Sequence, residues 1–151
     1  MLLTIDVGNT HTVIGGFEGD ELRYEWRMAT EIKKTEDEIG LTILHFLERV
    51  GVSVEDIEGI VIGSVVPVMT ESLFYMAKKY FSLKAVVVNN RIDPGLKLII
   101  DNPAEVGADR IADGVAAYEL YGGPVIVVDF GTGTTFDYIT ENGEYAGGVI
   151  A

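Results

Sequence analysis

Two short stretches of this 151-residue chain carry the same pattern of polar residues, 123 positions apart. In the first, an apolar run ends in Asp6, and the small polar residues 8–10 follow. In the second, an apolar run ends in Asp129, and the small residues 131–133 follow. Each pattern predicts a strand, a tight turn and a returning strand, with a carboxylate at the strand end. A polyphosphate and its metal ion suit such a pair, because the N–H groups of a small-residue turn form an anion-binding concavity.

The threonine hydroxyls in these turns can donate further hydrogen bonds to a phosphate, and the two aspartates can hold Mg²⁺ directly or through its water. A single copy of the pattern is more simply an ordinary hairpin, whereas two copies favour a phosphate site. Other phosphate-binding motifs fit less well. The chain has no GxxxxGK[ST] run, and Phe136 stands where a dinucleotide fingerprint beginning at Gly131 needs its third glycine.

The two motifs, DVGNT at 6–10 and DFGTGTT at 129–135, resemble the phosphate motifs of the acetate and sugar kinase/Hsp70/actin superfamily. Together with the GADR run at 107–110, they closely resemble type III pantothenate kinase. Gly133 stands where that family more often has alanine. The resemblance covers most of the chain. It implies a cytoplasmic homodimer that transfers the γ-phosphate of ATP to the primary hydroxyl of pantothenate, the first step of coenzyme A biosynthesis.

The same resemblance implies roles for individual residues. Asp109 is the general base and Arg110 contacts pantothenate. Asp6 organises Mg²⁺ through water, and Asp129 binds a monovalent cation, K⁺ or NH₄⁺. The implied ATP-binding residues are Asp6, Val7, Gly8, Asn9, Thr10, His11, Thr12, Val13 and Thr132. The implied pantothenate-binding residues are Gly107, Ala108, Asp109 and Arg110.

From spacing alone, Asp109 and Asp113 share one face of a helix and fit equally well as acids near a helix N-terminus. Two further functions also remain open. The protein could be another kinase or a phosphatase of the superfamily, since the phosphate motifs are shared. It could also be a non-catalytic, nucleotide-binding accessory factor of a transcription regulator.

Composition restricts these choices. Hydrophobic residues make up 48% of the chain and charged residues 23%, as in ordinary globular proteins. The chain has no cysteine, which excludes disulfides and thiol chemistry. A net charge of −13 argues against a nucleic-acid partner, because a phosphate backbone would be repelled. No apolar stretch approaches the roughly 20 residues of a membrane span. We therefore expect a soluble, cytoplasmic protein with no membrane partner.

The remaining patterns predict the elements that position these residues. Alternation predicts a third strand over 22–29, with Trp26 in the core or an interface. A capping box, Thr35 to Glu38, opens a helix that Gly51 ends. The other predicted elements are a strand over 57–66 closed by Pro67, a helix over 68–81, a strand over 84–88, a loop over 89–95 with an Asp-Pro-Gly turn, an extended segment or edge strand over 96–100, and a helix over 102–121.

This order predicts an α/β fold, with a βββαβαβα ribonuclease H-like domain over 1–121 and the first three strands of a second such domain over 124–151. The second sheet has apolar residues that need cover from the first domain, a second copy or a further C-terminal segment. These residues are Ile126, Val128, Phe136, Tyr138 and Ile139. We therefore expect weak or no kinase activity from these 151 residues alone, and self-association through 125–150.

Overall fold

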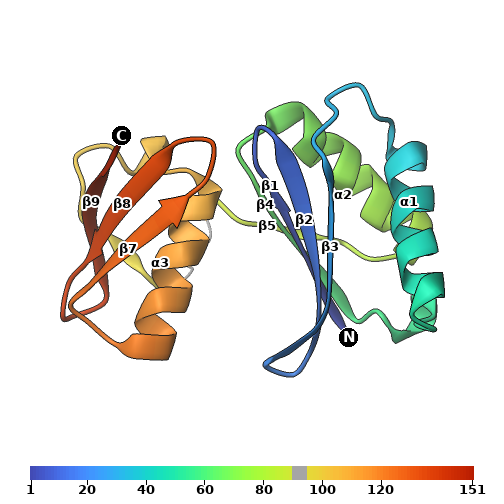
Figure 1. Ribbon diagram of the computed structural model, residues 1–151, viewed down its shortest axis with the longest axis horizontal. Helices are drawn as coiled ribbons and strands as arrows, with labels where there is room; N and C mark the ends of the chain where they lie inside the picture. The colour runs from blue at the N-terminus through green and yellow to red at the C-terminus, as the bar shows by residue number, and fades with distance from the viewer. Residues whose placement is uncertain (90–94) are drawn as a thin grey trace. The chain divides into compact units, whose positions relative to one another are not determined.

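The computed structural model describes residues 1–89 and 95–151 (Figure 1). It forms two compact units, Met1–Val87 and Val88–Ala151, each with its own sheet and its own buried cluster. The Asp-Pro-Gly turn predicted within 89–95 lies outside the described residues. Among the residues described, no helix has the length and apolar character needed to cross a membrane.

The first unit has three strands, a helix, a strand, a helix and a short strand, which confirms the predicted order. Its elements are β1 (Leu2–Val7), β2 (His11–Glu18), β3 (Glu21–Ala29), α1 (Glu36–Arg49), the 3₁₀ turn η1 (Val54–Asp56), β4 (Gly59–Ser64), α2 (Pro67–Phe81) and β5 (Val86–Val87). The sheet order is β3-β2-β1-β4-β5. Strands β1 to β3 are antiparallel, whereas β4 runs parallel to both β1 and β5. The ribonuclease H-like α/β class is thus confirmed for this unit.

Local sequence signals explain both helix starts. The Thr35 hydroxyl accepts a hydrogen bond from the Glu38 N–H at 3.3 Å, and the Glu38 carboxylate accepts one from the Thr35 N–H at 2.9 Å. This is the predicted capping box. Helix α2 begins at Pro67, one residue before the prediction, because proline fits the first turn of a helix, where its missing N–H costs nothing.

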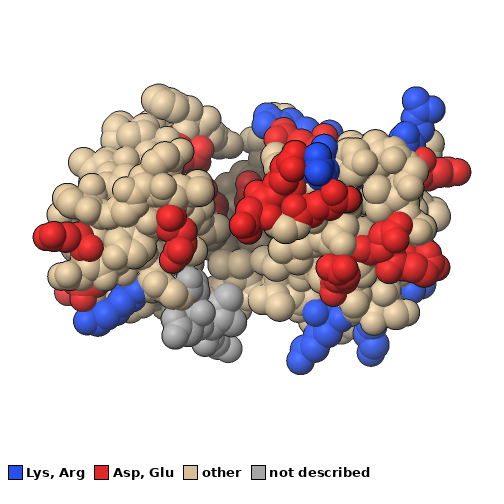
Figure 2. All heavy atoms as spheres, turned by 90° about the horizontal axis from the view of Figure 1, so that it is seen from below, with Lys and Arg blue, Asp and Glu red and all other residues tan. Residues whose placement is uncertain are grey.

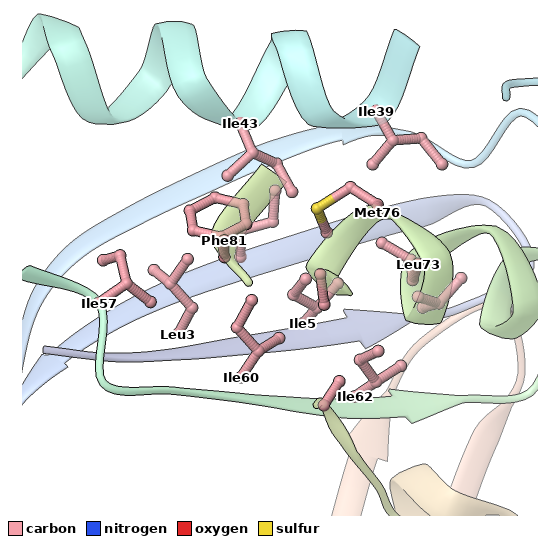
Figure 3. Close-up of a cluster of buried hydrophobic side chains, with 14 of the residues drawn as sticks. Leu3, Ile5, Ile39, Ile43, Ile57, Ile60, Ile62, Leu73, Met76 and Phe81 are labelled. Atoms are coloured by element: carbon pink, nitrogen blue, oxygen red, sulfur yellow. The ribbon is translucent and has the colours of Figure 1, made fainter. Parts of the chain in front are cut away.

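Helices α1 and α2 pack against the same sheet (Figure 1). The hydrophobic core lies between these helices and the sheet (Figure 3). Alternate residues of β1 and β4 are buried there, as the period-2 pattern of a half-buried strand requires. Figure 3 shows these strand side chains beside those of the two helices. The principal members are Leu3, Ile5, Ile60 and Ile62 from the strands and Ile39, Ile43, Leu73 and Met76 from the helices. Trp26 packs against this core and stacks on Phe46, with ring centroids 5.7 Å apart, as predicted.

The second unit is a four-stranded sheet with one α-helix against it. Its elements are β6 (Lys97–Leu98), the 3₁₀ turn η2 (Pro103–Glu105), α3 (Ala108–Tyr121), β7 (Val125–Phe130), β8 (Thr134–Ile139) and β9 (Glu144–Ile150). The order is β6-β9-β8-β7, with β7, β8 and β9 antiparallel and β6 parallel to β9. The segment 96–100 thus contains the edge strand that was one of its two predicted alternatives.

Helix α3 differs from its prediction in two ways. It begins at Ala108 and not at Asn102, because residues 103–105 form a separate 3₁₀ turn and Gly107 is the N-cap. It was also assigned to the first domain, whereas it packs on β7 and β8 of the second unit. Gly114 allows this close packing, since a Cβ there would lie 3.0 Å from side-chain atoms of both Ile139 and Leu96. The division between compact units therefore falls after Val87, and not near residue 121.

The opposite face of this second sheet is apolar and exposed. Ile126 pairs with Tyr138, and Phe136 lies between Val128 and Val149. We call these five residues the open face; their exposed fractions run from 38% at Phe136 to 64% at Ile126. Ile139 was predicted to need cover with them, but it is fully buried on the α3 side, because strand alternation turns it away from Tyr138.

Candidate functional site

The first predicted phosphate turn joins β1 to β2. Val7 and Thr12 form the last paired positions, and the Gly8 N–H donates to the His11 carbonyl at 3.0 Å. Asn9 and Thr10 are exposed at the tip. A Cβ on Gly8 would lie 3.3 Å from the His11 carbonyl oxygen, so the turn favours a residue without a side chain.

Thr30, which the sequence analysis did not single out, holds this turn in place. Its hydroxyl donates to the Gly8 carbonyl at 2.8 Å, and its N–H donates to the Thr10 carbonyl at 2.9 Å. The Thr30 and Thr12 hydroxyls are 3.0 Å apart and share a hydrogen bond. The available signal was its place directly after the predicted third strand, whose end returns to the turn through the β2–β3 pairing.

The residues predicted to bind ATP in the first unit differ in whether their side chains are exposed or buried. Asp6 is exposed, on the sheet face opposite the core, and its cross-strand partner is Val13. Val7 and Thr12 are fully buried, so only their main chains can reach a ligand. His11 is exposed at the start of β2.

The second predicted turn, between β7 and β8, is similar but one residue shorter. Its last strand pair is Phe130 with Thr134, so the turn consists of residues 131–133, whereas the first turn consists of residues 8–11. Asp129 nevertheless occupies the same next-to-last paired position as Asp6. Thr132 is exposed within the shorter turn. Both aspartates are thus exposed beside a small-residue turn, and the turns themselves are not superimposable residue by residue.

The GADR residues form the start of α3. Gly107 is the N-cap, Ala108 is buried, and Asp109 is half-buried in the first turn. One carboxylate oxygen of Asp109 accepts the Arg110 N–H at 2.8 Å. A carboxylate at this position interacts favourably with the positive end of the helix dipole.

Arg110 is directed toward the sheet and forms an ion pair. Its Nε donates to Asp137 Oδ1 at 2.8 Å, and its Nη2 lies 2.6 Å from the same oxygen. The Tyr145 hydroxyl donates to this oxygen as well. Asp137 and Tyr145 are each only 1% exposed, and neither was predicted as a site residue. The signal in the sequence was an acidic residue inside the apolar stretch that forms β8.

Burial shapes the electrostatics of this cluster. Burial, together with the hydrogen bond to Asp137, raises the pKa of Tyr145 well above its usual range. Burial acts to lower the pKa of Arg110, but the hydrogen bond and charge of Asp137 outweigh it, so the pKa of Arg110 is raised. Arg110 therefore remains charged and Tyr145 remains protonated at neutral pH.

The second unit brings Asp129 and the GADR residues to one side of its sheet. Asp129 pairs with Thr135, which lies two residues before Asp137 on β8, so both aspartates project from the face that α3 covers. This arrangement concerns residues 107–110 and 129, whereas Thr132 lies in the turn between β7 and β8. Residues 6–13 belong to the first unit.

The two exposed aspartates, Asp6 and Asp129, suit a cation that is held partly by water and substrate better than one enclosed by protein ligands. Within residues 1–89 and 95–151, no group of three or more histidines, cysteines or acids could hold a metal ion. Mg²⁺ commonly takes one or two carboxylates, with water and substrate phosphates completing its shell. An exposed carboxylate beside a turn, as at Asp6 and Asp129, suits that mode. Figure 2 shows that acidic side chains predominate over basic ones on the face in view, so a bound nucleotide would need such cations.

Comparison with solved structures shows the fold class. A reductive activator for a corrinoid, iron-sulfur protein matches 93% of this chain over 29% of its own length, with a TM-score of 0.60 at 12% identity. A putative N-acetylglucosamine kinase from Porphyromonas gingivalis matches 99% of this chain and 47% of its own, with a TM-score of 0.52 at 16% identity. A putative Baf family transcriptional activator from Campylobacter jejuni gives 0.54 at 21% identity, over 99% of this chain and 53% of its own. The fold is that of the sugar kinase and actin-like ATPases.

Sequence comparison identifies the family within that class. The type III pantothenate kinase family model matches residues 2–151, and the chain belongs to that family. It is 53% identical over its full length to a type III pantothenate kinase of Halalkalibacterium halodurans and 51% identical to one of Moorella thermoacetica. In both cases the chain spans 59% of the relative's length.

Proposed function

We propose that this chain belongs to an ATP-dependent kinase that phosphorylates the primary hydroxyl of pantothenate, the first step of coenzyme A biosynthesis. The observation that carries the proposal is the match to type III pantothenate kinases along the whole chain, at 51–53% identity. The geometry supports it through two exposed aspartates beside small-residue turns and a third aspartate at the start of α3.

The first unit would bind the nucleotide. The main chain of the turn at 8–10, with the exposed Asn9 and Thr10 side chains, would hold phosphate oxygens. Asp6 would hold Mg²⁺ through its water shell, and Asp129 would hold K⁺ or NH₄⁺. These cations would neutralise the charge that develops on the transferred phosphoryl group. Thr132 would add a donor from the second turn.

The second unit would bind the acceptor. Asp109 would accept the proton of the pantothenate hydroxyl as its oxygen attacks the γ-phosphorus in line. Gly107, Ala108 and Arg110 would contact the rest of the substrate. Phosphoryl transfer depends mainly on positioning and charge neutralisation, so these groups suffice without a protein nucleophile. We further propose a cytoplasmic location and a homodimer, on the basis of the family alone.

Pantothenate-dependent ADP release tests the proposal. Asp109→Asn should reduce turnover on the order of 10²–10⁴-fold, the usual cost of losing a general base, while ATP binding is retained. Asp101→Asn is the matched control, because Asp101 is an exposed acid of the same unit. The assay is run on the 151 residues and on the chain extended to the full length of its relatives.

The other outcomes separate the alternatives. ADP release with a sugar or acetate, but not with pantothenate, would identify another kinase of the superfamily. ATP binding without release for any acceptor would indicate a non-catalytic accessory role. Turnover of Asp109→Asn within a few-fold of the parent would contradict the assignment of the general base.

A further inference from the structure

Asp137 is the buried acid among the described residues, and it lies in the middle of β8. Burying an ionised carboxylate is costly unless it is paired and hydrogen-bonded. The neighbouring inward position on β8, Ile139, is apolar, so packing alone would favour an apolar residue at 137. The buried carboxylate therefore needs a reason beyond filling space.

Groups from two other elements converge on one oxygen of this carboxylate. Arg110 of α3 approaches Oδ1 with Nε and Nη2, and Tyr145 of β9 donates its hydroxyl to it. The guanidinium carbon also lies 6.0 Å from the centre of the Tyr145 ring, within the range of a cation–π contact. The Arg110 side chain is held on two sides and retains only 15% exposure.

The main chain of β9 closes a third side. Gly148 is the cross-strand partner of Asp137, and a Cβ there would overlap Arg110 Nη2, Asp137 Oδ1 and the Phe136 carbonyl oxygen. A glycine at 148 is thus required for the ion pair to occupy its observed place. The pair, the tyrosine and the glycine form one packed arrangement around the guanidinium.

This arrangement leaves donors for a second partner. An arginine has five N–H donors, and Asp137 engages the side-chain edge formed by Nε and Nη2 through a single oxygen. Nη2 is buried and has no well-aligned hydrogen bond, despite its closeness to Asp137. The next residue toward the N-terminus is Asp109, whose carboxylate accepts the Arg110 N–H. The orientation of the guanidinium therefore decides what can bind beside Asp109.

We propose that Asp137 is a positioning residue, which with Tyr145 holds the Arg110 guanidinium in the orientation that contacts the acceptor substrate. The inference rests on the proposed function, because the substrate contact of Arg110 is part of it. A free arginine side chain would lose rotamer freedom on binding, whereas one already held by Asp137 does not. Removing Asp137 should therefore weaken pantothenate binding and leave nucleotide binding unchanged.

Calorimetric binding and NMR of the arginine side chains test this without requiring turnover. Asp137→Asn keeps the size of the side chain but removes its charge. It should raise the pantothenate dissociation constant about 2- to 12-fold, the equivalent of immobilising one long side chain, and leave the ATP dissociation constant unchanged. Asp101→Asn, an exposed acid of the same unit, should change neither. In an active chain Asp137→Asn should raise KM for pantothenate more than it lowers kcat.

The NMR measurement follows the Arg110 Nε–H signal, which Arg110→Lys assigns by its loss. In Asp137→Asn this signal should move toward those of exposed arginines and exchange faster with water. Tyr145→Phe removes only a hydroxyl and should give a smaller change of the same kind, which also decides the question if Asp137→Asn does not fold.

The failures are distinguishable. If the parent protein, extended to the full length of its relatives, binds no pantothenate, the proposed function is refuted. In that case the NMR signal alone decides whether Asp137 positions Arg110. If the parent binds pantothenate and the folded Asp137 and Tyr145 variants bind it equally well, the inference is overturned. Equal weakening of ATP and pantothenate binding would also overturn it, since that indicates a purely structural role.

Discussion

Gly40 of α1 lies against the ring of Tyr80 on α2, and this contact offers a sharp test of how the first unit is packed. A Cβ on Gly40 would lie 2.5, 2.6 and 2.9 Å from three ring atoms of Tyr80. Carbon atoms in favourable contact are about 3.5–4.0 Å apart, so alanine requires the ring or the helix to move. The ring is anchored, because the Tyr80 hydroxyl donates to Asp37 at 2.7 Å and Asp37 also pairs with Lys79 at 2.6 Å.

Two opposing effects set the expected change in the free energy of unfolding. In an unhindered helix, alanine is more favourable than glycine by about 0.8–1 kcal/mol. Overpacking of a well-packed contact costs about 1–3 kcal/mol. One of the three ring atoms is Cγ, which cannot move away without shifting the whole side chain, so the steric cost should prevail. We expect Gly40→Ala to destabilise the protein by about 1 kcal/mol, within a range of roughly 0–2.

Urea unfolding of a double-mutant cycle measures this. In a Tyr80→Ala background the ring is absent, so Gly40→Ala should become stabilising by up to about 1 kcal/mol. Gly63→Ala is the control, because a Cβ at Gly63 meets no atom within 4 Å. If Gly40→Ala lowers stability equally with and without the Tyr80 ring, the close contact is not the cause and the reasoning is refuted.

Three other predictions concern the site and the surface. Asp6→Asn should weaken the Mg²⁺ dependence of nucleotide binding and Asp129→Asn the response to K⁺, and identical loss of both responses in ion titrations would show that the two roles are wrongly divided. The hydrogen bonds from the Thr35 N–H and the Thr35 hydroxyl lower the pKa of Glu38 from its usual value of 4.5. The difference in unfolding free energy between the parent and Glu38→Gln should therefore be complete above pH 4.5 and should disappear as the pH falls through the lowered pKa. Denaturation curves recorded over this pH range measure the difference. Ile126→Lys places a charge on the open face, on strand β7 at the edge of its sheet, and should reduce the concentration-dependent self-association seen by analytical ultracentrifugation, whereas an unchanged association would exclude this face.

Short-range signals in the sequence predicted most of the elements. The capping box at Thr35, the alternation in the third strand and the two turns were each predicted correctly. These features depend on interactions between residues only a few positions apart, so the local sequence suffices to specify them. The polar motifs that indicate phosphate chemistry are local in the same sense.

Where the chain's elements meet was decided by the tertiary structure. The apolar face of α3 showed that this helix must pack on a sheet, but not on which of the two sheets, because an apolar stripe can be buried against any apolar surface. Thr30 contacts residues about 20 positions away, and Arg110 contacts Asp137 across 27 positions. Such pairs depend on how strands align after the chain has folded back. The sequence therefore determined which chemical groups are present, and the strand register determined that Arg110, Asp137 and Tyr145 share one buried oxygen, because only folding brings groups so distant in the chain within hydrogen-bond range.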